Sequence, residues 1–167
     1  MKYIDTKIKG FRLRSSVRED VDLILSLIKE MAIYENMLNE VIATKESIKE
    51  SIFEKKQAEA MIAEFNGEPI GYVLYFFNYS TFVGRSGFYL EDIYIKKEYR
   101  GMGLGKEIFK VISKIAHENG CKRMEWSCLN WNTPSIKFYK SLGAIPMDEW
   151  TVYRLTEDNI KSIINNR

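Results

Sequence analysis

The sequence YLEDIYIKKEYRGMGLGKEIFK, residues 89–110, joins three structural signals in one short stretch. Residues 89–96 are rich in β-branched and aromatic side chains, which predicts a strand. Apolar side chains then recur at helical spacing from Leu104 to Ile115, which predicts an amphipathic helix. Three glycines stand within five residues between the two. The stretch therefore predicts a strand–turn–helix unit whose turn can approach a ligand closely.

The turn has the composition of a phosphate-binding loop, and it reads Arg100-Gly101-Met102-Gly103-Leu104-Gly105-Lys106. Amide N–H groups at a helix start point outward at the positive end of the helix dipole, which suits a phosphate or pyrophosphate. Its spacing matches neither the dinucleotide motif G-x-G-x-x-G nor the ATP loop G-x-x-x-x-G-K-[ST]. The alternative is a glycine-rich turn that holds no ligand.

Length, composition and charge limit the classes of protein to which the chain can belong. The chain has 167 residues, 46% hydrophobic and 29% charged, which indicates one ordinary globular domain over residues 1–167. Its net charge of +2 is too small to indicate a nucleic-acid partner. No apolar segment reaches the roughly 18 residues of a membrane span, and the N-terminus lacks the apolar core of a signal peptide. We therefore expect a cytoplasmic protein without a membrane partner.

The cysteines and the single histidine offer little material for metal chemistry. Cys121 and Cys128 form no C-x-x-C motif, so neither a zinc site nor a disulfide framework is supported. His117 lies late in a predicted helix, where a solvated position explains it. We expect no metal cofactor.

The other elements predict a mixed α/β sheet with helices on both faces, in the order β-α-α-β-β-β-α-β-α-β. Ser16-x-x-Glu19 has the signature of a capping box that opens the first helix, and Asn66-Gly67 that of a hairpin turn. We expect an N-terminal extension at residues 1–9 and an irregular connection at residues 78–87. The other expected strands lie at residues 11–14, around Ala60, and at 70–77, 124–129 and 151–155, and the other helices at 21–32, 44–54, 103–119 and 133–142, before a polar tail helix.

A second segment adds to the glycine turn. Residues 130–139, NWNTPSIKFY, place an asparagine, a short proline-initiated helix and a tyrosine in succession. With the R-G-x-G-x-G-K turn, this resembles the two segments that contact acetyl-CoA in the GNAT superfamily of N-acetyltransferases. With LIKEM at residues 27–31, Tyr34-Glu35 and YLED at residues 89–92, the chain resembles the spermidine/spermine (diamine) and thialysine N-ε-acetyltransferase family from about residue 11 to 155.

This resemblance implies a GNAT fold, acetyl-CoA as co-substrate, and a small primary amine as acceptor, either a diamine or polyamine or a thialysine- or lysine-like amino acid. It also implies a homodimer with substrate bound near the subunit interface. Exposed aromatic residues near the C-terminus could pack against such a partner, although core packing explains them equally well.

Acyl transfer to an amine requires two proton transfers, and each calls for a particular type of side chain. Neutralising an alkylammonium at pH 7 costs about 4 kcal/mol, and a carboxylate can take the proton directly or through water. The departing thiolate needs a proton, which a tyrosine hydroxyl can donate. The resemblance assigns Tyr139 as this acid and Glu91 as the base or ammonium anchor. The residues alone equally allow Tyr139 a packing role on an amphipathic helix.

Further residues are assigned to the amine site by the resemblance. Glu91 and Asp92 are adjacent, so a regular strand would direct them to opposite faces, and Asp92 could bind the amine or orient the backbone. Tyr34 and Glu35 end the first helix, where Glu35 could hold a distal ammonium or be an ordinary solvated glutamate. Glu125 is a weaker candidate of the same kind.

Ser80 bears on the choice of amine. Tyr79-Ser80-Thr81-Phe82 replaces the Tyr-Asp-Pro-Trp type of the polyamine-acetylating members, so Ser80 stands in place of an acidic residue. The loss of one carboxylate weakens attraction for a polycation and tolerates a zwitterion better. This slightly favours a thialysine-like amino acid.

The resemblance also assigns the acetyl-CoA site. Only main-chain atoms of the strand residues are expected to take part, by pairing with the pantetheine arm. The assigned residues are Ile93, Tyr94 and Ile95 on the strand, Arg100, Gly101, Met102, Gly103, Leu104, Gly105 and Lys106 around the pyrophosphate, and Asn132, Ser135 and Tyr139 in the second segment.

Two other functions compete with this one. A protein acetyltransferase acting on lysine side chains or N-termini would need an open groove, against which the bulky aromatic segment at residues 79–82 argues mildly. A non-catalytic CoA-binding module would be expected to lose Tyr139 or the acidic residues. Because no cysteine stands at the position of Tyr139, we expect direct transfer in a ternary complex, with a covalent role for Cys128 disfavoured.

Overall fold

The computed structural model describes residues 2–165. The chain divides into two compact units, Met1–Ser127 and Cys128–Arg167. The helices and strands are, in chain order, β1 (Tyr3–Asp5), β2 (Phe11–Ser15), α1 (Val21–Tyr34), α2 (Lys45–Ile48), β3 (Glu59–Phe65), β4 (Glu68–Ser80), β5 (Arg85–Ile95), α3 (Leu104–Glu118), β6 (Met124–Glu125), α4 (Thr133–Ser141) and α5 (Glu157–Asn165). A π-helical segment, Lys49–Glu54, continues α2.

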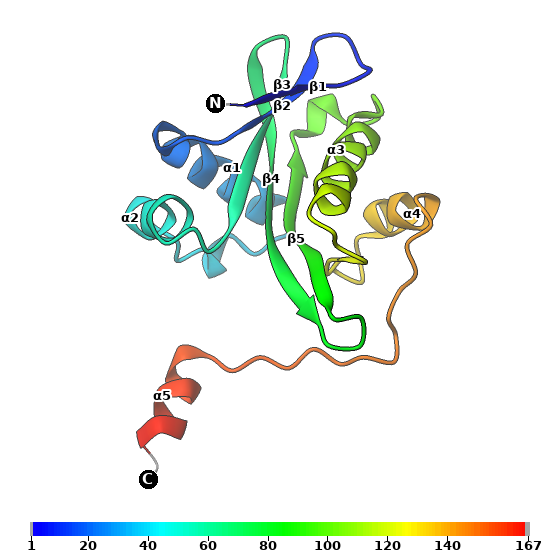
Figure 1. Ribbon diagram of the computed structural model, residues 1–167. Helices are drawn as coiled ribbons and strands as arrows, with labels where there is room; N and C mark the ends of the chain where they lie inside the picture. Colours follow the sequence, from blue (N-terminus) through cyan, green and yellow to red (C-terminus); the bar gives the residue numbers. More distant parts are fainter. Residues whose placement is uncertain (1, 166–167) are drawn as a thin grey trace. The chain divides into compact units, whose positions relative to one another are not determined.

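The first unit is built on one six-stranded sheet with the order β1-β2-β3-β4-β5-β6. Neighbouring strands from β1 to β5 are antiparallel, and β5 pairs with β6 in parallel. The helices α1 and α2 lie on one side of this sheet and α3 on the other (Figure 1). The mixed α/β sheet with helices on both faces is therefore confirmed.

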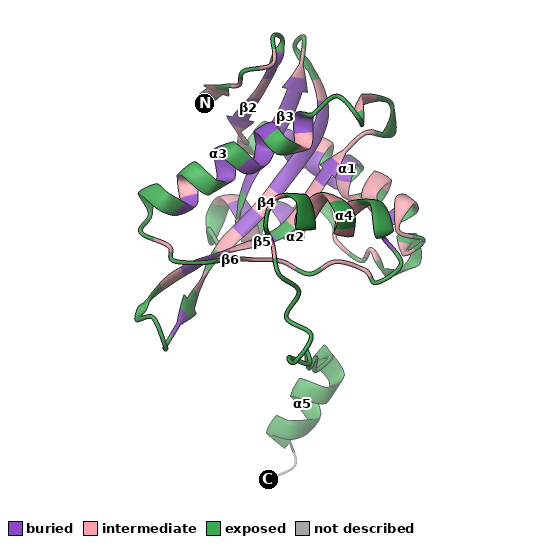
Figure 2. Cartoon of the chain, turned by 90° about the vertical axis from the view of Figure 1, so that its right-hand side faces the viewer, coloured by how far each residue is buried: buried purple, intermediate pink, exposed green. Residues whose placement is uncertain are grey.

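The core between α1, α2 and the sheet follows from the apolar periodicity of the sequence. Val21, Ile24 and Leu25 on α1 are buried against strand residues that include Ile62 and Tyr72. On the other side of the sheet, α3 buries an apolar stripe that includes Leu104, Ile108 and Ile112. Buried residues accordingly lie along the strands and on one side of α3, whereas α5 is exposed throughout (Figure 2).

Several sequence-based predictions of the elements are confirmed. The hairpin between β3 and β4 turns at Asn66 and Gly67, whose φ angles of 52° and 89° suit a tight turn of the hairpin type. Helix α3 ends at Glu118 just before Gly120, which has the positive φ of a helix-terminating glycine. The second helical segment begins after Thr44, whose side chain accepts a hydrogen bond from the Ser47 N–H.

Two predictions for the N-terminal part are wrong. Residues 1–9 are not only an extension, because Tyr3–Asp5 pairs with β2 and the Tyr3 ring lies 4.2 Å from the Arg12 guanidinium carbon. The capping box Ser16-x-x-Glu19 does not form. Instead the Asp20 carboxylate accepts the Val17 N–H at 2.8 Å, and α1 begins after Asp20.

Three predictions for the later strands are also wrong. Residues 78–87 are not irregular, because β4 and β5 pair out to Ser80 and Arg85, helped by the stacking of Phe76 on Tyr89. The strand expected at residues 124–129 is shorter than predicted, because β6 comprises only Met124–Glu125. Residues 151–155 form no strand, and their side chains are exposed, so the β-prone sequence there lacks the pairing that a strand needs.

A bulge interrupts the pairing of β4 with β5 at Glu91. Leu90 pairs with Tyr75 and Asp92 with Leu74, so Glu91 is an extra residue without a partner in the ladder. Directly paired residues share a face, and neighbouring residues on β4 point to opposite faces. Leu90 and Asp92 therefore lie on opposite faces of the sheet although only one residue separates them.

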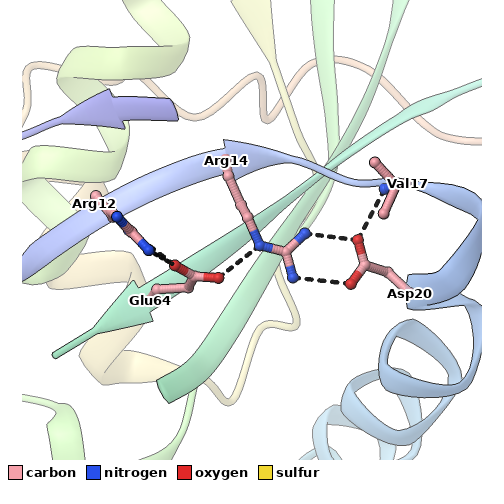
Figure 3. Close-up of polar contacts among 5 residues, drawn as sticks. All are labelled: Arg12, Arg14, Val17, Asp20 and Glu64. Atoms are coloured by element: carbon pink, nitrogen blue, oxygen red, sulfur yellow. Dashed lines mark hydrogen bonds and ion pairs between the residues drawn. The ribbon is translucent and has the colours of Figure 1, made fainter. Parts of the chain in front are cut away.

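A buried ion network ties β2, β3 and the start of α1 together (Figure 3). The Arg14 guanidinium donates to both carboxylate oxygens of Asp20, at 2.6 and 2.8 Å, and its Nε donates to Glu64 at 2.6 Å. Arg12 adds a second donor to Glu64 at 2.9 Å. Each buried charge of the network has a partner of opposite charge, which offsets the cost of removing it from water. The network also fixes the start of α1 relative to β2 and β3.

Within residues 128–165, the second unit contains two helices, α4 and α5. Helix α4 begins at Thr133, with Asn132 as its cap and Pro134 in its first turn, as the sequence predicts. It ends before Leu142 and Gly143, and Gly143 has a φ of 88°. The predicted tail helix is present as α5.

Candidate functional site

Acidic side chains and a tyrosine gather in the first unit where α1, β4 and β5 approach one another. The Tyr72 hydroxyl donates to Asp92 Oδ2 at 2.8 Å and also lies 3.5 Å from Met31 Sδ on α1. Glu35, at the end of α1, and Glu91, at the bulge, are close enough for their charges to act on both Tyr72 and Asp92. The predicted residues Glu35, Glu91 and Asp92 are thus brought into one cluster.

The cluster shifts the proton affinities of its members. Burial raises the pKa of Asp92 to about 6, and the charges of Glu91 and Glu35 act in the same direction, while the hydrogen bond from Tyr72 opposes them. Burial also raises the pKa of Glu35. The pKa of Tyr72 lies far above its usual value, chiefly because the ring is buried, so the hydroxyl keeps its proton and donates. Asp92 is therefore an ionised carboxylate at pH 7 that accepts protons more readily than an ordinary aspartate.

The bulge changes the geometry expected for the adjacent pair. Glu91 is exposed, whereas Asp92 is half-buried and on the face of Tyr72. Strict alternation, on which the expectation of opposite faces rests, is interrupted at this point. Of the two carboxylates, Asp92 is the one held by a side chain of the core.

Arg100 links the glycine turn to the end of α1. Its Nε donates to the Ile95 carbonyl at 2.9 Å, and its guanidinium carbon lies 4.3 Å from the ring centroid of Tyr34 and 5.6 Å from that of Tyr94. Such cation–π contacts are favourable. The structure therefore joins a residue predicted for the phosphate turn to a residue predicted for the amine site.

The glycine turn has the backbone that its sequence predicts. Gly101 and Gly103 have φ angles of 80° and 79°, which side-chain-bearing residues rarely adopt. The Gly103 carbonyl accepts from the N–H groups of Lys106 and Glu107, so α3 begins directly at the turn. The N–H groups of Leu104 and Gly105 precede these two in the first turn, where N–H groups can serve an anion. Leu104 is buried and fixes the turn to the core, whereas Met102 and Lys106 are exposed.

The strand residues assigned to pantetheine lie beyond the bulge. Ile93, Tyr94 and Ile95 pair with β4 through one edge of β5. On the other edge, β6 pairs with β5 at Phe88 and Tyr89, before the bulge. Within residues 2–127, the two strands thus separate before the segment at residues 93–95.

In the second unit, the residues predicted to contact the co-substrate share one helix. Asn132 Oδ1 accepts from the Ser135 N–H at 3.4 Å at the start of α4. Tyr139 follows Ser135 by four residues, which places both on the same face of the helix. The Tyr139 carbonyl accepts from the N–H groups of Leu142 and Ala144, which closes the helix after this residue.

Two predicted amine-site residues are not part of the carboxylate cluster. Ser80 lies at the tip of the β4–β5 hairpin, six residues from the partner of Asp92, which corresponds to about 20 Å along a strand. Glu125 is engaged with Arg123 and Asn78, both at 3.0 Å. Tyr72, by contrast, is a cluster member that the sequence analysis missed, because only the register of β4 with β5 and the bulge bring it to Asp92.

Comparison with known proteins defines the class of this chain. The sequence model of the Acetyltransferase (GNAT) family matches residues 28–144. The chain belongs to this family and is an N-acetyltransferase, as the resemblance implied.

Several relatives are named as acetyltransferases of thialysine or ornithine. A thialysine N-epsilon-acetyltransferase from Bos taurus is 36% identical over 163 residues and covers 90% of this chain and 95% of its own length. The protein of the same name from Caenorhabditis elegans is 30% identical, with coverage of 89% and 93%. An L-ornithine N5-acetyltransferase from Arabidopsis thaliana is 27% identical, with coverage of 95% and 92%.

Solved structures agree in fold. An integron cassette protein from V. cholerae superposes with a TM-score of 0.78 at 18% identity, covering 95% of this chain and 99% of that one. An aminoglycoside acetyltransferase from an uncultured soil metagenomic sample reaches a TM-score of 0.74 at 15% identity, with coverage of 88% and 97%. Together with the family match, these likenesses confirm the GNAT fold.

Residues 2–165 hold neither a helix that could span a membrane nor a side-chain cluster suited to a metal ion. None of the helices there has both the length and the apolar character of a membrane span. The same residues hold no group of three or more histidine, cysteine, aspartate or glutamate side chains suited to a metal ion.

Proposed function

We propose that this protein transfers the acetyl group of acetyl-CoA to the primary amine of a small molecule. Membership of the GNAT family and the names of the relatives support the reaction. The observation that carries the choice of a small amine is the cluster of Glu35, Glu91 and Asp92, because its negative charge suits an alkylammonium and its most buried member can accept a proton.

The residues present fit acetyl-CoA as co-substrate. A Cβ atom placed on Gly101 would meet no atom within 4 Å, so the space beside the turn is open. We propose that residues 100–106 hold the pyrophosphate, that the main chain of residues 93–95 pairs with the pantetheine arm, and that Asn132, Ser135 and Tyr139 complete the site. When bound, acetyl-CoA supplies an activated acetyl group as a thioester.

Residues of the chain then carry out two proton transfers. A carboxylate, Glu91 or Asp92, takes a proton from the substrate ammonium and so generates the neutral nucleophile. The Tyr139 hydroxyl donates a proton to the departing sulfur. Main-chain N–H groups at the separated strands can stabilise negative charge on the reacting carbonyl oxygen. We infer direct transfer in a ternary complex, without an acyl-enzyme.

The preferred amine is proposed to be a thialysine- or lysine-like amino acid, with diamines and polyamines as poorer substrates. Ser80 in place of an acidic residue supports this preference, as do the thialysine and ornithine acetyltransferases among the relatives. We also propose that both units form one domain, since the family match at residues 28–144 spans both, and that two chains form a homodimer.

A thiol-release assay with acetyl-CoA tests this function. The panel comprises thialysine, lysine, ornithine, putrescine, spermidine, spermine and a lysine peptide. We expect thialysine or lysine to have the highest kcat/KM, and Tyr139→Phe to lower kcat by about 100-fold or more. Tyr153→Phe, which removes an exposed hydroxyl from the same unit, is the control and should keep full activity. The assignment fails if only the peptide is acetylated, and the role of Tyr139 fails if Tyr139→Phe is fully active.

A further inference from the structure

Tyr72 stands at the centre of the carboxylate cluster, although its sequence context gives no hint of chemistry. Its relative exposure is 0%, and its ring belongs to the core between α1 and the sheet. A buried hydroxyl needs a hydrogen-bond partner, and that of Tyr72 donates to the Asp92 carboxylate at 2.8 Å. The ring therefore anchors in the core a hydroxyl that reaches a reactive group.

The same bond distinguishes the two adjacent carboxylates. Asp92 lies in the paired part of β5, opposite Leu74, and one of its oxygens is fixed by Tyr72. Glu91 is exposed, has a longer side chain, and stands at the unpaired position of the bulge. A proton acceptor must be held in a productive geometry, and Asp92 meets this demand better than Glu91.

We propose that Tyr72 is a positioning residue for N-acetylation: its hydroxyl holds Asp92 Oδ2 so that Asp92, rather than Glu91, accepts the proton of the substrate ammonium. This inference rests on the proposed function. In the step, an N–H bond of the ammonium breaks and an O–H bond forms at Asp92 Oδ1. The electron pair stays on nitrogen, the ammonium becomes a neutral amine, and the carboxylate becomes a neutral carboxyl group.

The pH dependence that follows has a definite sign. The groups acting on Asp92 are Tyr72 on β4, Glu91 on β5 and Glu35 at the end of α1. The Tyr72 hydroxyl stabilises the ionised form of Asp92, whereas the two glutamates destabilise it. Loss of the hydroxyl should therefore raise the pKa of Asp92, and loss of the Glu91 charge should lower it.

The first test is the pH profile of kcat/KM for the best amine in wild type, Tyr72→Phe and Glu91→Gln. Wild type should lose activity below about pH 6. In Tyr72→Phe this acid limb should move upward by about one pH unit, and in Glu91→Gln it should move downward. An acid limb that stays in place in Tyr72→Phe, or that vanishes in Glu91→Gln, overturns the proposal.

Tyr75→Phe is the matched control. Tyr75 is also buried on β4, and its hydroxyl also donates to a carboxylate, that of Glu59 at 2.9 Å. It pairs with Leu90, which lies on the opposite face from Asp92. Its loss should lower stability by a similar amount and leave the acid limb where it is. A merely structural Tyr72 would behave in the same way as Tyr75.

A second measurement does not depend on turnover. The carboxyl carbon of Asp92, labelled with ¹³C and assigned with Asp92→Asn, should titrate near pH 6 in wild type and at higher pH in Tyr72→Phe. An unmoved titration refutes the positioning role even if no amine in the panel is acetylated. Absence of all turnover, by contrast, refutes the proposed function, so the two failures are distinguishable.

Discussion

Arg14 illustrates how much the free energy of one residue depends on its partners. It is buried between Asp20 and Glu64, whereas Arg18 pairs with Glu54 at 3.1 Å at the surface. A surface pair is well solvated whether or not it forms, and contributes at most about 1 kcal/mol. A buried charge that loses its partner is not solvated by water, so the loss costs much more free energy.

Asp20→Asn should therefore lower the free energy of unfolding by about 3–5 kcal/mol at pH 7. Glu54→Gln, which removes one side of the surface pair, should lower it by less than about 1 kcal/mol. Urea unfolding followed by circular dichroism measures both. Equal effects of the two substitutions would show that the network contributes no more than a surface pair.

Asp20 should also make the fold sensitive to acid. Burial alone would raise the pKa of Asp20, but hydrogen bonds from Arg14 and the Val17 N–H hold it below its usual value. A carboxylate with a depressed folded pKa contributes stability above its unfolded pKa and loses it as pH falls through the folded value. The stability difference between wild type and Asp20→Asn should accordingly shrink below about pH 4, as measured by urea unfolding across pH 2–7.

Asp92 should have the opposite effect on stability. Its folded pKa of about 6 exceeds the ordinary aspartate value, so the folded protein binds the proton more tightly than the unfolded chain, and stability falls as pH rises from about 4 to 6. Asp92→Asn should remove this dependence and be more stable than wild type at pH 8 by about 1 kcal/mol while losing activity. A less stable Asp92→Asn protein at pH 8 would contradict the raised pKa.

At the scale of elements, the paired strands β4 and β5 position the site, and their close approach leaves little room for a side chain at two glycines. A Cβ on Gly71 would lie 2.1 Å from the carbonyl oxygen of Tyr94 in the neighbouring strand. A Cβ on Gly87 would meet side-chain atoms, with Asn78 Oδ1 nearest at 2.2 Å. Side chains can rotate away, but paired backbone cannot move without breaking the ladder.

Gly71→Ala should consequently lower the free energy of unfolding by about 1–3 kcal/mol or more, and Gly87→Ala by less. Both substitutions add one methyl group to the same strand pair, so the comparison isolates the nature of the atom that the methyl group meets. Thermal unfolding of the two variants beside wild type measures the difference. The reverse order would indicate that Asn78 is held more rigidly than the backbone.

The elements also show what sequence reasoning can reach. Residues 89–110 predict strand, turn and helix because local spacing and glycine content decide them. The bulge at Glu91 and the contact of Tyr72 with Asp92 depend on register between strands, which no local pattern encodes. At residues 151–155 the local pattern predicts a strand that is absent from the structure, because β-prone side chains form a strand only where another strand pairs with them.

At the scale of the whole molecule, exposed aromatic residues motivate the prediction of an assembly. In the second unit, Trp131, Trp150 and Tyr153 are 51%, 70% and 91% exposed. Large exposed apolar side chains are typical of surfaces that bind a protein partner. We expect a mass of two chains in analytical ultracentrifugation, and a shift toward one chain when Trp150 and Tyr153 are both replaced by Ser. A single-chain mass for wild type at micromolar concentration would refute the homodimer.

The bulge at Glu91 has a consequence for how such a gene can change. Removal of this one codon would let Leu90 and Asp92 pair with Tyr75 and Leu74 in an unbroken ladder, with every later residue still on its own face. The shortened chain should fold at least as well, since bulges disturb the ladder, and Asp92 would stay on the face of Tyr72 while Glu91 is lost. A single in-frame deletion would thus separate what the bulge contributes to activity from what it costs in stability.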